Sequence, residues 1–410
     1  MKSIKNIERE LAPAIKALMR KNKNLLGALT VVAGFGLIGT FMIVASQAAT
    51  YSVQKEAEDG TTAGNFESVS DTLASGGRYI KFGGGGGTTP PPAGGDPDRA
   101  DWNCGGSFSG DVGGTIQPKP AGNVINAGGD PSSAISSAGP GDVVVIPPGE
   151  YGSLDIDGQG EANNCITIMG DGGIASFSGI KVNGSYLRIM NISSKGSGSY
   201  GWSVDGNNHI TLANVKVEGS QNGGIQFAEA SFILIDGCDV DHTNGGPGNS
   251  GEGEAISVAD SSTNSEVRYC KVHDSGEEGI DVKYSNEMAG GTQVKVHHNE
   301  VFGNGGPNIY IDGVNGVKVY NNKVYGATKD SKSGIMLGCE SNWVHAGGGS
   351  SRDIEIFNNE IHDNAAAGIS VFDGGCGIND IYVHDNTLSG GDDLDLGGAT
   401  GVREENNTIN

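Results

Sequence analysis

Apolar and polar residues alternate at a period of two through the second half of the chain, and the alternating stretches recur at regular intervals. The recurring unit reads apolar-x-apolar-x-x-Asn-x-Val, then polar residues, then Gly-Ile-x-Val, and Val240 follows Val217 by 23 residues. Alternation at this period indicates β-strands with the apolar side chains on one face. The last apolar residue of the first half of the unit recurs at Ser194, Val217, Val240, Val272, Val301, Val324, Ile361, Leu388 and Ile409.

Short strands that repeat every twenty-odd residues, separated by Gly and Asn, are typical of a parallel solenoid. A leucine-rich repeat is disfavoured because its leucine consensus and helical stretches are absent, and a propeller needs four strands in a longer repeat. The apolar run 143–146, followed by Pro-Pro-Gly-Glu-Tyr, resembles the opening coil of pectate-lyase-like β-helices. We therefore predict an all-β, single-stranded, right-handed parallel β-helix over residues 101–410.

A polar residue precedes most of these repeat positions by two. Asn side chains at a bend can bond from coil to coil and tolerate left-handed backbone, so we interpret this column as structural. Its members are Cys238, Cys270, Asn299, Asn322, Asn359, Asn386 and Asn407.

The six cysteines follow the same spacing. Cys238 and Cys270 share the position two before the repeat residue, and either a disulfide or a pair of stacked thiols is compatible with this arrangement. Cys339 and Cys376 each lie 15 residues after a repeat position, which predicts that they are within bridging distance. Cys104 and Cys165 remain, both in the N-terminal part. The chain lacks the Cys-x-x-Cys spacing of a zinc site.

The N-terminal region predicts export. Residues 1–24 form a basic, cytoplasmic segment, and residues 25–46 are a transmembrane anchor or a long signal peptide. Both interpretations place the remaining chain outside the cell, either at the cell surface or secreted. We expect a short β segment or stalk over 51–82 and a Gly/Pro linker over 83–100.

Charge excludes one class of partner. The formal net charge is −23 although the first 50 residues are basic, so the exported part is strongly acidic. Such a body repels nucleic acid, and we expect none as a partner. An acidic surface suits cations such as calcium.

The strands of the Gly-Ile-x-Val type bring several acids and one lysine to a single outer face. Carboxylates crowded together repel one another unless a cation joins them, which suggests calcium. A lysine beside them is a candidate base for removing a proton α to a uronate carboxylate. The candidate metal ligands are Glu252, Glu254, Glu277, Glu278 and Asp281, the candidate base is Lys283, and Tyr310 and Asp312 lie one coil further on.

Two short motifs resemble polysaccharide lyases. Residues 252–257, Glu-Gly-Glu-Ala-Ile-Ser, resemble the Glu-x-Glu-x-Ile-Ser segment of the alginate lyase and chondroitinase B family, in which the glutamates help to hold calcium. The lysine of that family would fall at Ala259, and this chain instead carries Lys283 at the same spacing in the next coil. Residues 277–281, Glu-Glu-Gly-Ile-Asp, resemble the calcium motif of lysine-dependent pectate lyases, whose own base is not matched at 308–311.

These resemblances imply a calcium-assisted lyase that acts on an acidic polysaccharide. Lys283 would be the base, Tyr310 the proton donor, and Asp312 and Trp343 would contact the sugars. The alternatives are a plain ion pair between Lys283 and Asp312 and a non-catalytic surface adhesin or glycan-binding β-helix. His-Asp pairs such as His273-Asp274 recur at one repeat position, so we interpret them as structural.

Overall fold

The computed structural model describes residues 66–70, 78–82, 122–171, 174–246, 253–285, 292–340 and 350–410. The chain divides into two units, Met1–Gly94 and Gly95–Asn410. In the first unit, strands β1 (Phe66–Ser70) and β2 (Arg78–Phe82) pair antiparallel. The predicted segments 1–24, 25–46 and 83–100 lie outside the described residues. Within the described ranges, no helix is long and apolar enough to cross a membrane.

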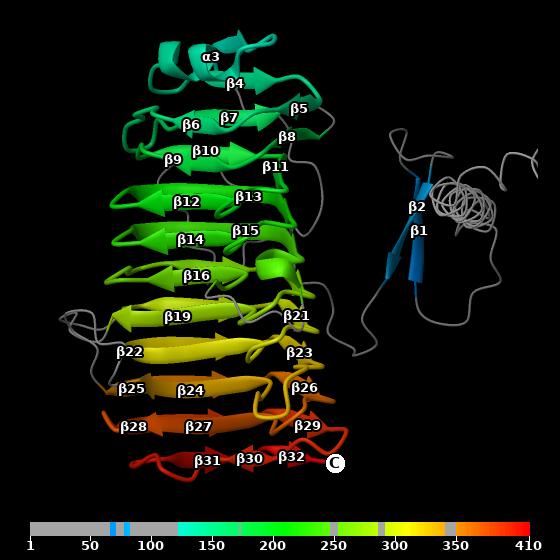
Figure 1. Ribbon diagram of the computed structural model, residues 1–410, viewed down its shortest axis with the longest axis vertical. Coiled ribbons are helices and arrows are strands. Elements are labelled where there is room, and N and C mark those ends of the chain that lie inside the picture. The colour runs from blue at the N-terminus through cyan, green and yellow to red at the C-terminus, as the bar shows by residue number, and fades with distance from the viewer. Residues whose placement is uncertain are drawn as a thin grey trace, which may run out of the picture. The chain divides into compact units, whose positions relative to one another are not determined.

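The described residues of the second unit, from 122 onward, form a right-handed parallel β-helix, the fold predicted from the sequence (Figure 1). Each coil places its strands in three parallel sheets, which follow one another around the coil. The first sheet contains, in stacking order, β6 (Leu154–Ile156), β9 (Ile180–Val182), β12 (Trp202–Asp205), β14 (Ile225–Ala228), β16 (Ile256–Ala259), β19 (Ile280–Ser285), the start of β22 (Ile309–Tyr320), β24 (Ile335–Glu340), β27 (Ile369–Gly374) and β30 (Leu394–Asp395).

The second sheet follows the first around each coil. It contains β3 (Val124–Asn126), β4 (Val143–Ile146), β7 (Ile166–Gly170), β10 (Leu187–Met190), the starts of β13 (Asn208–Glu218) and β15 (Ser231–Asp241), β17 (Glu266–Arg268), β20 (Val294–His297), the end of β22, β25 (Ser351–Phe357), β28 (Ile378–His384) and β31 (Arg403–Glu405).

The third sheet completes each coil. It contains β5 (Gly149–Tyr151), β8 (Ala175–Phe177), β11 (Ile192–Lys195), the ends of β13 and β15, β18 (Lys271–His273), β21 (Glu300–Phe302), β23 (Lys323–Tyr325), β26 (Glu360–His362), β29 (Thr387–Ser389) and β32 (Thr408–Ile409). A 3-10 turn, η3 (Thr243–Gly245), follows β15.

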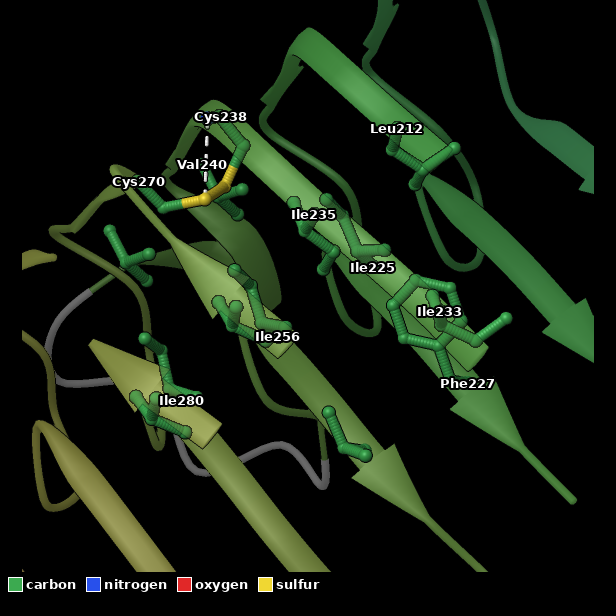
Figure 2. Packing of buried hydrophobic residues seen from close by; sticks show 14 of the residues in the cluster. Leu212, Ile225, Phe227, Ile233, Ile235, Cys238, Val240, Ile256, Cys270 and Ile280 are labelled. Carbon is green, nitrogen blue, oxygen red and sulfur yellow. Dashed lines mark hydrogen bonds between the residues drawn. A yellow bond between two sulfur atoms is a disulfide. The ribbon is translucent and has the colours of Figure 1, made fainter. Parts of the chain in front are cut away.

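Inward side chains from the three sheets form one continuous apolar core. Ile225 of the first sheet, Ile235 of the second and Val240 of the third all point into it (Figure 2). The predicted repeat positions stack in register in the third sheet from Ser194 to Ile409, and those from Val217 to Leu388 are fully buried. The register predicted from the sequence is therefore confirmed.

The predicted polar column forms an asparagine ladder at the bend between the second and third sheets. Asn322 accepts bonds from the backbone N–H and the side-chain amide of Asn299, both at 3.0 Å, and its own amide donates to Asn359 at 3.0 Å. The same pattern continues to Asn386 and Asn407. The amides from Asn299 to Asn386 are thus bonded to the next coil, and that of Asn407 bonds back to the Val383 carbonyl, which confirms a structural role.

Disulfides join adjacent coils, and this favours an oxidising, extracytoplasmic compartment. Cys238 and Cys270 are bonded at a Cα–Cα distance of 4.3 Å and occupy the ladder position (Figure 2). Cys339 and Cys376 are also bonded, at 5.7 Å, although Cys339 pairs in register with Asp373. Cys165 is disulfide-bonded too, and Cys104, the other remaining cysteine, lies outside the described residues.

A short helix that we did not predict covers the core beside the first coils. Helix α3 (Pro131–Ser137) buries Ile135 and packs against β4 and β6. The sequence carries its signal, because Asp130 accepts a bond from the Ser133 N–H at 3.0 Å and Pro131 stands at the first helical position.

Candidate functional site

The candidate site lies on the outer face of the first sheet, where β19 and β22 run side by side. Ile280 and Val282 point into the core, so Asp281 and Lys283 point outward. Asp281 pairs in register with Tyr310, and Lys283 with Asp312. Four side chains that the sequence marked as candidates are therefore neighbours on two consecutive coils.

Lys283 is held by two carboxylates. Its Nζ bonds to Glu254, from the turn before β16, and lies 3.2 Å from Asp281 Oδ2. Burial alone would lower the pKa of Lys283, but the charges of Asp281 and Glu254 outweigh it and raise the pKa. In this arrangement the side chain is an ammonium ion, which already neutralises part of the acidic cluster.

Asp281 and Asp312 are almost completely buried, with exposed fractions of 2% and 1%. One oxygen of each, Oδ1, has no hydrogen-bond partner among the described residues. Burial, more than any neighbouring charge, raises the pKa of Asp281 and brings that of Asp312 to about 7. These carboxyl groups consequently hold protons at pH values where exposed aspartates are ionised.

Tyr310 is fixed by the following coil. Its hydroxyl donates to Glu340 Oε1 at 3.0 Å, and its ring lies over Gly338, where a Cβ would overlap it. Burial, followed by the charges of Asp312 and Glu340, raises the pKa of Tyr310, so the phenol keeps its proton. Glu340 was not predicted, because it follows Cys339 at the end of β24 and resembles no lyase motif.

The remaining predicted acids differ in their surroundings. Glu277 bonds to Lys329 at 2.6 Å, whereas burial and the charge of Glu254 raise the pKa of Glu278, which places Glu278 beside the cluster. Glu252 and Trp343 lie outside the described residues.

Tyr200 extends the site toward the earlier coils, and sequence reasoning missed it. Burial and the charge of Glu254 raise its pKa, and its ring lies against Gly223. Tyr200 also lines a groove of about 520 Å³ over β6, β9 and β12, together with Lys181, Ser203 and Asp205. It belongs to a turn outside the repeat unit, so no periodic signal marks it.

The structure also brings together a group that could hold a metal ion. Over the described ranges, it consists of Asp239, Asp241 and His273, whose ligand atoms all lie within 4.8 Å of one another. This group lies on the third sheet, on β15 and β18, whereas Asp281, among the predicted calcium ligands, lies on β19 of the first sheet.

Comparisons with known proteins agree with the architecture. A family model described as a right handed beta helix region matches residues 156–324 and 253–409. No curated protein sequence matches the chain.

Among solved structures, an alginate lyase from Paenibacillus sp. str. FPU-7 is 19% identical, with a TM-score of 0.49 over 70% of this chain and 99% of that one. The pectate lyase Pel9A is 13% identical, with a TM-score of 0.49 over 69% and 78%. The periplasmic alginate epimerase AlgG is 12% identical, with a TM-score of 0.48 over 70% and 83%. At these values the likeness carries no inference about chemistry.

Proposed function

We propose that this chain, which belongs to the right-handed β-helix family, is an extracytoplasmic, calcium-assisted polysaccharide lyase that cleaves uronate glycans by β-elimination. The observation that carries this proposal is the grouping of Lys283 and Tyr310 with buried carboxyl groups on consecutive coils of one sheet. A groove on the same sheet, lined by Tyr200, offers room for further sugar units.

Each side chain has a defined task in the proposed reaction. Lys283, an ammonium ion in its ion pairs with Glu254 and Asp281, first releases a proton to water. The neutral amine then takes the proton from C5 of the uronate, α to the carboxylate. The electron pair forms the C4–C5 double bond, and the C4–O bond of the glycosidic link breaks. Tyr310 donates its proton to the departing oxygen and regains one from water. Asp312 and Trp343 contact the sugars.

The acids of this face fit a hard cation. The buried Asp281 carboxylate carries an oxygen without a partner among the described residues, and oxygen-rich sets of this kind suit calcium. Calcium would be held by Glu252, Glu254, Glu278 and Asp281. Glu277 would join these ligands once its ion pair with Lys329 breaks. When bound, calcium neutralises the uronate carboxylate and makes the C5 proton more acidic.

A second candidate function follows from the ion pairs of Lys283. In the structure its ammonium is held by Glu254 and Asp281, and a protonated lysine is not a base. A non-catalytic glycan-binding surface would keep these ion pairs and bind acidic sugars without cleaving them.

The test is the appearance of unsaturated uronate, followed by its ultraviolet absorbance over alginate, pectate and chondroitin, with and without a chelator. We expect product with one of these glycans, its loss with chelator, and a loss of at least about 100-fold in Lys283→Ala and Tyr310→Phe. Lys318→Ala is the matched control, because Lys318 is an exposed lysine on β22 outside the site. Saturable glycan binding without product would favour the second candidate.

A further inference from the structure

A second polar cluster lies on the outer face of the third sheet. Asp239 and Asp241 alternate with the buried Val240 on β15, so both point outward. His273 lies on β18 of the next coil and pairs in register with Asp241. His273-Asp274 belongs to the recurring His-Asp pairs that the repeat alone explains as structural. His384 has a similar setting, with Nδ1 on Asp385 and Nε2 on the single carboxylate of Glu355, whereas His273 lies beside two strand aspartates.

The imidazole of His273 is oriented as a metal ligand would be. Its Nδ1 lies 2.8 Å from Asp274 Oδ2, and its Nε2 lies 3.3 Å from Asp239 Oδ1. When Nδ1 donates to Asp274, the lone pair of Nε2 faces the two strand aspartates. Metal-binding histidines usually donate their second N–H to a carboxylate in this way.

A cation already occupies the position between the two aspartates. Lys216 Nζ, from the previous coil, lies 3.4 Å from Asp239 Oδ2 and 3.4 Å from Asp241 Oδ2. The Lys216 side chain is 39% exposed, so its ammonium can move into water. The Asp241 side chain is only 9% exposed and cannot follow it. The two carboxylates thus form a binding position for a cation, and the Lys216 ammonium that occupies it can move away.

We propose that Asp239, Asp241 and His273 form a binding site for a divalent transition metal such as zinc, which displaces Lys216. Two carboxylates balance the charge of a dication, and the imidazole nitrogen favours zinc over calcium, which prefers oxygen ligands. The bound ion would join two adjacent coils of the third sheet. This site shares no residue with the proposed lyase site on the first sheet.

The same columns offer an internal control at His362. It also bonds to an adjacent aspartate, with Nδ1 2.8 Å from Asp363 Oδ2. In the coil before it, however, Lys323 and Tyr325 occupy the positions that Asp239 and Asp241 hold in the coil before His273. His362 therefore has the supporting carboxylate without the pair of strand ligands, and we expect it to bind no metal.

The experiment is isothermal titration of the tag-free, metal-stripped full chain with zinc chloride, and with calcium chloride for comparison. We expect one saturable zinc site that calcium does not compete for. Affinity should fall at least about tenfold in His273→Ala, Asp239→Asn and Asp274→Asn, stay unchanged in His362→Ala, and rise in Lys216→Met. Circular dichroism of each variant checks that it folds.

The decisive variant is Lys216→Met, because it removes a competitor without touching a ligand. Tighter zinc binding in Lys216→Met together with loss in His273→Ala supports the site. Absence of saturable zinc binding in the folded wild-type protein, or an equal loss in His362→Ala and His273→Ala, overturns it. Because binding is measured without glycan, neither result depends on whether the protein is a lyase.

Discussion

Two stacks of polar side chains run along the solenoid, and they differ in how completely their polar atoms are hydrogen-bonded to one another. In the asparagine ladder the same residue recurs, and Asn322 and Asn359 are each bonded to the coils on either side. On the first sheet the residue changes from coil to coil, from Ser257 to Asp281 to Tyr310, and buried carboxyl oxygens lack a partner among the described residues. In these two stacks, the repeated asparagines bond to one another, whereas the varied positions of the first sheet leave carboxyl oxygens for which a ligand could supply a partner.

The largest expected effect on stability comes from the disulfide between Cys238 and Cys270, which occupies two positions of the ladder. Replacing both Cys238 and Cys270 by alanine removes a cross-link across 32 residues and should lower the free energy of unfolding by about 3 kcal/mol. Replacing both by asparagine should cost less, because the Cys270 backbone N–H already bonds to Asn299 as a ladder residue does. Urea unfolding of the two double variants measures the difference. Equal losses would show that the ladder cannot extend into these coils.

The buried Asp312 on the first sheet should make the stability of the protein depend on pH. Asp312 has its pKa raised to about 7 in the folded protein, against an ordinary value of 3.8. Between these values the folded chain holds a proton that the unfolded chain has lost, so stability should fall as pH rises through this window. Asp312→Asn should remove this fall, which we expect to be on the order of 2–3 kcal/mol between pH 4 and 8. Parallel stability curves for both proteins would contradict the assignment.

The ladder should instead respond to a deletion that is independent of pH. Asn322→Ala removes four bonds from a buried position and takes away the acceptor of the Asn299 backbone N–H, while the Asn299 side-chain amide keeps its bond to the Val267 carbonyl. We expect a loss of about 2 kcal/mol that is the same at pH 5 and pH 8, measured by chemical unfolding. A loss confined to one pH would mean that the ladder is coupled to a titrating group.

An exposed ion pair supplies the smallest effect. Lys318 bonds to Glu355 at 2.7 Å on the outside of the second sheet, and its side chain is 55% exposed. Lys318→Ala should change the free energy of unfolding by less than about 1 kcal/mol. A thermal melt checks this value, and a larger loss would show that outer charge pairs between coils matter more than their exposure suggests.

The fold could be predicted because its strands repeat along the sequence. Much of the site could not be predicted, because its residues do not recur from coil to coil. The stacking of Val217 on Val240 and the outward pairing of Asp281 with Tyr310 both follow from counting along the repeat. Tyr200 and Glu340 were missed because they stand at a turn and at the end of a strand, outside the repeating unit. Helix α3 has no counterpart among the described residues of the later coils, so periodicity gives no sign of it.

The ion pairs of the site were beyond sequence reasoning for a different reason. Lys283 and Asp312 are partners in register, so the repeat alone suggested that they bond. The structure instead directs the lysine back toward Glu254 and along its own strand to Asp281. The choice depends on side-chain rotamers and on which carboxylate is ionised, and neither is encoded in a spacing.

The register of the stacked coils has an evolutionary consequence. Strands pair parallel with the coil before and the coil after, so a duplicated coil can enter the stack and present the same pairing edges to its new neighbours. Such an insertion lengthens the molecule without rebuilding its interior, while point changes at outward positions alter one coil at a time. Gene duplication can therefore change the reach of the outer faces independently of the chemistry that any single coil carries.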